Sequence, residues 1–282
     1  MVSSQSLQFE KMVMDGHPFD AAAAGYDSTF TETRLGRFYR GMVRQRLSGY
    51  VRPGGRALEL GCGTGADASW LARHGMTVIA TDASPAMLAV AGRTAERNGV
   101  TGSIEFRPLD LNDPASFAVS LSDQAPDFQL VLANFGPLNC VEDRRGLSRR
   151  LAGVVAPGGY LAMTVMGPLC PWEIIWHGAR LEFRVALRRL RSGAPADAGG
   201  PDSFPVWYPS MRRLEVEFGS HFKTVERAGL GLLLPPSGMN RLVDRAPRLF
   251  RPLGVIDRRL AGTRVWHWLN DHYLLVMERT AR

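Results

Sequence analysis

The sequence predicts a doubly wound α/β fold built around one mostly parallel sheet. Between residues 56 and 166, short apolar runs alternate with helical stretches, which is typical of strand-helix-strand units. Turn or capping residues follow each apolar run. The 282 residues are enough for one large domain or two small ones, with a core that needs no disulfide or metal staples.

The first five strands and the helices between them carry clear local signals. The apolar runs lie at 56–60, 76–81, 103–107, 127–133 and 160–166. Ser84 precedes Pro85 and Asp113 precedes Pro114, and both pairs predict an N-cap followed by proline at the first helical position. A tight Pro-Gly-Gly turn at 157–159 is expected to lead into the fifth strand.

The segment before the first strand is expected to cover one end of the sheet. We expect residues 1–18 to form a loose leader without the apolar stretch of a secretory signal. Leu35, Phe38, Met42 and Leu47 lie on one face of a helix. Residues 19–166 are therefore predicted to be a Rossmann-like core with an N-terminal helical cover.

After residue 166 the rhythm changes, which predicts two insertions in the core. Prolines and a Gly/Ala/Asp-rich stretch at 192–200 mark a lid at 167–209, within which 172–191 has the apolar spacing of one helix. The core sheet is expected to end within 210–282. We expect Ser210 to cap a helix there and 222–227 to form a sixth strand. The second insertion spans 235–270, and 272–279 is an antiparallel last strand, giving seven strands.

Composition and cysteine usage indicate a soluble protein of the cytoplasm. With 45% hydrophobic and 22% charged residues, the chain is unlike disordered, collagen-like or multi-span membrane proteins. Residues 151–172 carry no charge, but proline and glycine break them, so we expect a helix end, a turn and a buried strand. Cys62, Cys140 and Cys170 lack metal-ligand spacing, so we expect free thiols and no metal site.

The net charge of +7 belongs to the C-terminal part of the chain. Residues 1–166 carry 16 basic and 16 acidic side chains, whereas 167–282 carry 18 and 11. Nearly all of the excess is arginine, which suits a solvated surface, an acidic or phosphorylated substrate, or peripheral contact with an anionic membrane. Residues 245–259 mix arginine with apolar residues, although Pro247 and Pro252 are expected to interrupt a helix there. No nucleic-acid partner is expected, because no RNA-binding module is recognisable.

The most informative motif is the glycine loop at the end of the first strand. Its sequence at 59–65 is Glu-Leu-Gly-Cys-Gly-Thr-Gly, and glycine lets the backbone turn sharply and approach a nucleotide. Gly61, Gly63 and Ala66 also match a dinucleotide fingerprint. Asp82 ends the second strand, where a carboxylate accepts hydrogen bonds from a ribose. These features alone leave open a nicotinamide-dependent oxidoreductase.

The ordered combination of motifs resembles the class I S-adenosylmethionine-dependent methyltransferases. The matches run from Phe19-Asp20 through Tyr26-Asp27, and continue with 58–65, 81–87, Asp110-Leu111, 134–136 and 157–159. The resemblance implies that S-adenosyl-L-methionine is the cofactor. It implies these contacts: Gly61, Gly63 and Gly65 under the methionyl part, Glu59 toward the amino group, Asp82 on the ribose, Met87 beside the adenine, and Asp110 with the Leu111 backbone at the adenine edge. It also places Tyr26, Cys62, Ala83, Asn134 and Phe135 at the cofactor.

The acceptor is expected to be a small molecule, methylated on oxygen, nitrogen or carbon and possibly acidic or lipid-like. Residues 134–137 are Asn-Phe-Gly-Pro, so the Asp/Asn-Pro-Pro-Tyr and Pro-Cys motifs of other methyltransferases are absent. Glu173 and His177, one helical turn apart, are the candidate catalytic residues. A non-catalytic cofactor-binding module or partner subunit and an RNA methyltransferase stay open as alternatives, and the oligomeric state is not predicted.

Overall fold

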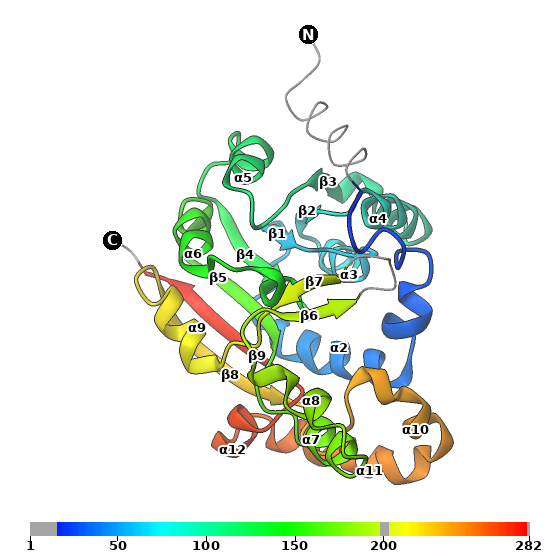
Figure 1. The fold of residues 1–282 in the computed structure, drawn as a ribbon. Coiled ribbons are helices and arrows are strands. Elements are labelled where there is room, and N and C mark those ends of the chain that lie inside the picture. The colour runs from blue at the N-terminus through cyan, green and yellow to red at the C-terminus, as the bar shows by residue number, and fades with distance from the viewer. Residues whose placement is uncertain (1–15, 198–202, 281–282) are drawn as a thin grey trace.

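The computed structural model describes residues 16–197 and 203–280 and contains a seven-stranded sheet with helices on both faces (Figure 1). The strand order is β3-β2-β1-β4-β5-β9-β8. The bounds are β1 Arg56–Leu60, β2 Thr77–Asp82, β3 Ile104–Pro108, β4 Phe128–Ala133, β5 Val155–Met166, β8 Phe222–Leu230 and β9 His272–Arg279. The first five are parallel, and β9 runs antiparallel to β5 and β8, which confirms the predicted fold.

Helices cover both faces because strand residues alternate in direction. Ala57 belongs to one buried core and its neighbour Leu58 to the other. The core that contains Ala57 is closed by α2 Arg34–Leu47, α3 Ala66–Arg73 and α4 Pro85–Arg97. The opposite core is closed by α5 Pro114–Leu121, α6 Arg144–Ala152 and α9 Met211–Phe218. The shorter turns are η1 Asp27–Thr31, η2 Thr101–Ser103, η3 Pro137–Cys140 and η5 Ser237–Met239.

The predicted helix starts are confirmed in detail. The Ser84 side chain accepts a hydrogen bond from the Met87 amide, and the Asp113 side chain accepts one from the Ala115 amide. Ser210 caps α9 in the same way. Each cap satisfies one of the amide groups that the first helical turn leaves unpaired.

Two strands are longer than expected. β5 begins at Val155, so the Pro-Gly-Gly turn at 157–159 is an irregularity within the strand, where the pairing with β4 shifts register. β8 is the edge strand, and it continues to Leu230 because eight of its nine residues pair with β9, with Val225 at a register shift.

The first insertion, at 167–209, does not contain the single helix predicted at 172–191. It contains α7 Pro171–Gly178, α8 Phe183–Ala186 and η4 Arg188–Leu190. The break follows Gly178, and Leu181 adopts the left-handed backbone conformation with φ of 60°, which no continuous α-helix accommodates. Downstream, β6 Ala194–Asp197 pairs with β7 Ser203–Val206 in a separate two-stranded ribbon. The end of the predicted Gly/Ala/Asp-rich stretch, 198–200, lies outside the described residues.

The second insertion folds as α10 Asn240–Arg245, α11 Pro247–Leu260 and α12 Arg264–Trp268. The interruption expected at Pro247 is found, because α10 ends at Arg245 and α11 begins at Pro247. The one expected at Pro252 is wrong, because Pro252 lies inside α11, exposed. The helix is held by its buried stripe of Phe250, Gly254 and Asp257. The Asp257 carboxylate accepts hydrogen bonds from three successive backbone amides, at 232–234, and from the indole of Trp266. Within the described residues, no helix has both the length and the apolar character needed to cross a bilayer.

Candidate functional site

A cavity of about 490 Å³ lies at the carboxyl ends of the parallel strands. Strands β1 and β4 are neighbours there although β2 and β3 lie between them in sequence, so the chain order reverses at this point. In open α/β sheets such a switch point is where ligands bind. The cavity is lined by all but one of the predicted cofactor residues: Tyr26, Glu59, Gly61, Cys62, Gly63, Asp82, Ala83, Met87, Asp110, Leu111, Asn134 and Phe135.

The glycine loop is shaped by close contacts. Gly61 has φ of 64°, and a Cβ there would stand 2.5 Å from Cγ of Pro137. Gly65 is the predicted cofactor residue that does not line the cavity, since it packs against Ala91 of α4, where a Cβ would stand 2.9 Å from the Ala91 side chain. Gly61 therefore shapes the cavity wall, and Gly65 sets the distance between the loop and α4.

Asp82 joins the loop to the end of β2. Its Oδ2 accepts a hydrogen bond of 2.8 Å from the Gly63 amide and its Oδ1 one of 2.9 Å from the Ser84 amide. Burial raises the pKa of Asp82, although these amide bonds act in the opposite direction. Each oxygen keeps a further lone pair for a ligand hydroxyl.

A buried charge cluster forms the wall behind the loop. Asp67 is bound by Arg40 and by Arg44, whose Nε lies 2.8 Å from Oδ1, and it accepts a 2.7 Å hydrogen bond from Nδ2 of Asn134. Burial raises the pKa of Glu59 well above its ordinary value, and the Asp67 carboxylate raises it further. Oε2 of Glu59 and Oδ1 of Asn134 are buried acceptors with no hydrogen-bond partner among the described residues.

These two unpaired oxygens test whether the site fits the expected cofactor. Unsatisfied buried acceptors are rare, and each calls for a donor. Glu59 and Asn134 both line the cavity. A ligand that carries an ammonium group supplies such donors and would favour the ionised form of Glu59. These two acceptors therefore fit the amino-acid end of S-adenosylmethionine, which carries the ammonium group.

An aromatic wall lies beside this cluster. The rings of Phe30 and Phe135 are 5.2 Å apart between centroids, and Phe135 is 5.5 Å from the His272 ring. The guanidinium of Arg40 stands 5.2 Å over the Phe135 ring. Phe135 has a φ of 57°, which is strained for a residue with a bulky side chain. The fold thus holds Phe135 in a strained backbone conformation that places its ring at the cavity.

Among the residues that line the cavity, His272 has the hydrogen-bond partners best suited to a side chain that accepts a proton. Its Nδ1 lies 2.9 Å from Oδ2 of Asp271, and Oδ1 of Asp271 accepts a 2.6 Å bond from Nη2 of Arg189. Burial acts to raise the pKa of Asp271, but His272 and Arg189 outweigh it, so this pKa lies well below its ordinary value. A charged Asp271 favours the tautomer in which Nδ1 donates, which leaves Nε2 of His272 as an acceptor.

The two predicted catalytic candidates do not line the cavity. Glu173 is buried, and its carboxylate accepts hydrogen bonds from Arg188 and Arg189. His177 contacts Glu182 at the surface, with 2.5 Å between Nδ1 and Oε2. Glu173 thus connects the first insertion to Asp271 through Arg189. His177 has no comparable connection to the cavity among the described residues.

Several cavity residues were not identified from the sequence, among them His17, Phe30, Arg40, Asp67 and His272. For His272 a signal existed. The last strand was expected to be antiparallel, and the first residue of an antiparallel strand lies at the carboxyl edge of its parallel neighbours. Asp67 and Arg40 carried no such signal, because their partners are distant in sequence.

The cysteines at the cavity are not activated. Burial raises the pKa of Cys62 well above its ordinary value and that of Cys140 to about 12. A protonated thiol is a poor nucleophile. Both side chains therefore act through packing.

Comparison with known proteins identifies the family. Residues 57–159 match the model of a methyltransferase domain. Over 197 residues the chain is 30% identical to a demethylmenaquinone methyltransferase of Corynebacterium urealyticum, covering 69% of this chain and 76% of that protein. Over 129 residues it is 36% identical to a ubiquinone biosynthesis O-methyltransferase of Methylocella silvestris, covering 45% and 46% of the two chains.

A solved structure supports the same fold. The DhpI-SAH complex superposes with a TM-score of 0.56 at 19% identity and covers 94% of both chains. The nicotinamide alternative for the glycine loop is therefore excluded, and the enzyme uses S-adenosylmethionine. The chain belongs to the class I S-adenosylmethionine-dependent methyltransferases.

Proposed function

We propose that this methyltransferase methylates an oxygen or a ring carbon of a small phenolic acceptor of the quinol type. One observation carries the proposal. The cavity is lined both by the strand-end loops and by Arg188, Phe204, Val206 and Tyr208 of the lid, so cofactor and acceptor would share one cavity. The names of the relatives support a quinone-derived ring.

The lid supports this acceptor class by its chemistry. Phe204 and Tyr208 add aromatic surface to that of Phe30 and Phe135, which suits a flat ring. Bound cofactor and acceptor, together with the lid side chains, would exclude water from the transfer. Residues 167–209 would therefore cover the acceptor, and residues 19–166 would bind the cofactor.

The proposed cofactor contacts follow the geometry of the strand ends. Glu59 would accept hydrogen bonds from the amino group, and Asp82 would accept them from the ribose hydroxyls while the Gly63 and Ser84 amides hold it in place. Met87, which is buried at the start of α4, would flank the adenine together with Ala83 and Leu111. When bound, the cofactor supplies a methyl group already activated on sulfur, so positioning contributes most of the catalysis.

His272 is the proposed general base. Nε2 would take the proton of the acceptor hydroxyl while the oxygen or the adjacent ring carbon forms its bond to the methyl group. The carbon–sulfur bond breaks with its electron pair staying on sulfur. For carbon attack, the ring proton leaves to solvent afterwards, and the hydroxyl is restored by the proton on His272. Asp271 would stabilise the imidazolium that forms.

Binding and turnover test the proposal separately. Calorimetric titration with S-adenosylmethionine and its demethylated product tests the cofactor site. Incubation with methyl-labelled cofactor and a reduced 2-unsubstituted 1,4-naphthoquinone, followed by mass spectrometry, tests the acceptor class. A methylated naphthoquinol supports the proposal. Cofactor binding without methylation of this probe or of a matched catechol overturns the acceptor class.

The free, unpaired cysteines agree with the proposed cytoplasmic location.

A further inference from the structure

Large apolar side chains are exposed mainly on the two insertions. Among the described residues, fourteen large hydrophobic side chains are exposed, and all but Val216 and Val225 belong to 167–209 or 235–270. In the first insertion these are Ile175, Leu181, Phe183, Val185, Leu187 and Leu190; in the second they are Leu249, Val255, Ile256, Val265, Trp268 and Leu269. Such clustering marks an interaction surface, because single exposed apolar residues are normally scattered.

The same segments carry a strong excess of positive charge. Their exposed arginines are Arg180, Arg184, Arg188, Arg191, Arg241, Arg245, Arg248, Arg251, Arg258, Arg259 and Arg264. Where burial is described, the exposed acidic residues of these segments are Glu182 and Asp244, and Asp244 forms an ion pair with Arg34. The net charge of the chain is thus concentrated on its most apolar surface.

Helix α11 shows how the two properties are combined. Its inner face is the buried stripe that ends at Asp257. Leu249 and Ile256, seven residues apart, form an exposed apolar stripe, and Arg251 and Arg258, also seven apart, form a charged one. An amphipathic helix of this kind lies in the plane of a membrane interface.

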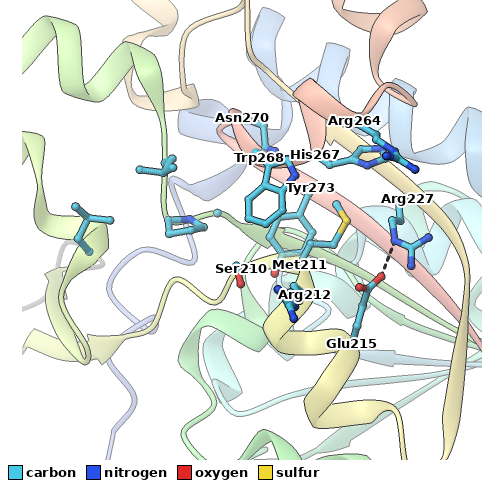
Figure 2. A pocket seen from close by; sticks show the side chains of 14 residues that line it. Ser210, Met211, Arg212, Glu215, Arg227, Arg264, His267, Trp268, Asn270 and Tyr273 are labelled. Carbon is cyan, nitrogen blue, oxygen red and sulfur yellow. Dashed lines mark hydrogen bonds and ion pairs between the residues drawn. The ribbon is translucent and has the colours of Figure 1, made fainter.

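The two insertions lie against each other. Trp172 of α7 packs against Phe250 of α11, with ring centroids 6.1 Å apart. Leu190 of η4 lines the same cavity of about 690 Å³ as Arg264 and Trp268 of α12 (Figure 2). In Figure 1, α7, α8, α11 and α12 gather at one end of the molecule.

We propose that this surface, defined by α7, α8, η4, α11 and α12, docks onto an anionic phospholipid bilayer. Charge complementarity argues for this occupant: an anionic leaflet attracts each surface arginine, while the aliphatic side chains and Trp268 enter the acyl boundary. An acidic protein surface would match the charge but would leave the apolar side chains uncompensated. The proposal does not depend on the acceptor assigned above.

Vesicle co-sedimentation of the full chain tests it. Vesicles of phosphatidylcholine alone are compared with vesicles containing phosphatidylglycerol. We expect binding to the anionic vesicles that weakens as salt rises, because salt screens the attraction. Reversal of three arginines, Arg248→Glu, Arg251→Glu and Arg259→Glu, should weaken binding on the order of 100-fold. Leu249→Asn with Ile256→Asn should weaken it at constant charge.

Matched controls separate this surface from charge in general. Arg93→Glu, Arg145→Glu and Arg149→Glu make the same charge change at exposed positions of the cofactor half and should retain most of the binding. Ile175→Asn with Leu187→Asn tests the first insertion if an α11 variant fails to fold, as judged by circular dichroism and cofactor binding. No preference for anionic vesicles, equal loss in the control triple, or lipid-free dimerisation through this face would overturn the proposal.

Discussion

His272 and Asp271 are adjacent in sequence and joined by a 2.9 Å contact between Nδ1 and Oδ2, at the point where the antiparallel last strand enters the sheet. Asp271 continues this chain of contacts to Arg189 in the lid. One carboxylate thereby supports a cavity-lining imidazole and an insertion that lies more than eighty residues earlier in the sequence.

Replacing His272 should separate proton transfer from cofactor binding. For His272→Gln we expect kcat with the naphthoquinol probe to fall by about 10²- to 10⁴-fold, because the proton acceptor is lost, with the cofactor Kd unchanged. His221→Gln, outside the cavity, is the control. Full activity of His272→Gln would eliminate the general-base role.

Asp271→Asn should destabilise the fold as well as the site. The variant leaves the buried guanidinium of Arg189 with Glu173 as its remaining carboxylate, and we expect the free energy of unfolding at pH 7 to fall by about 3 kcal/mol. Because the folded-state pKa of Asp271 is lowered, its stabilisation is present above an unfolded pKa of about 4 and is lost as pH falls further.

Urea unfolding of Asp271→Asn at pH 7 and at more acidic pH measures this effect, and the gap to wild type should narrow in acid. Asp123→Asn is the control. Its partner Arg107 holds the pKa of Asp123 at about 2, but that carboxylate is 54% exposed, so its loss should cost less than about 1 kcal/mol. A pH-independent gap would contradict the assignment of a charged Asp271.

Gly61→Ala should disrupt the cofactor loop. The new Cβ meets Pro137, and alanine also resists the left-handed backbone, which costs about 1–2 kcal/mol before any clash. We expect at least tenfold weaker cofactor binding by calorimetry. Gly92→Ala, a helical position whose Cβ would meet nothing within 4 Å, should leave affinity unchanged. Equal affinities of the two variants would refute the close-contact argument.

Cofactor binding should release a proton through Glu59. Burial and Asp67 raise the pKa of Glu59, and a bound ammonium group would favour its ionised form. Calorimetry in buffers of different ionisation enthalpy, repeated over a range of pH, should detect proton release wherever Glu59 is partly protonated in the free enzyme. In Glu59→Gln we expect no such release and affinity lower by about 10- to 100-fold, the loss of one charged hydrogen bond. Exposed Glu96→Gln should behave as wild type.

The core was predictable because its signals are local. β1 and β9 have the predicted bounds, and Ser84 and Asp113 cap their helices as expected, since apolar runs and capping pairs depend on a few adjacent residues. The glycine loop, Asp82 and the residues after each strand reach one cavity because parallel strands end at one edge. Their proposed contacts with the cofactor stay predictions.

The insertions and the acid–base residues were harder to predict because distant contacts determine them. Asp257 anchors α11 through backbone amides more than twenty residues away, which outweighs the interruption expected from Pro252. Pro195 and Pro205 face each other in the β6–β7 ribbon, where no further strand requires their missing N–H groups. Glu173 was noticed for its spacing to His177, but its partners are the two arginines of η4.

The link between Arg189 and Asp271 also bears on how the acceptor enters and leaves. Swinging η4 outward would break two buried ion pairs of Arg189, so this end of the lid acts as a fixed hinge. The β6–β7 ribbon contributes Ala196, Phe204 and Val206 to the cavity and pairs with no strand of the seven-stranded sheet. We therefore expect acceptor and product to pass beside this ribbon and not beside η4, so that the imidazole keeps its support during exchange.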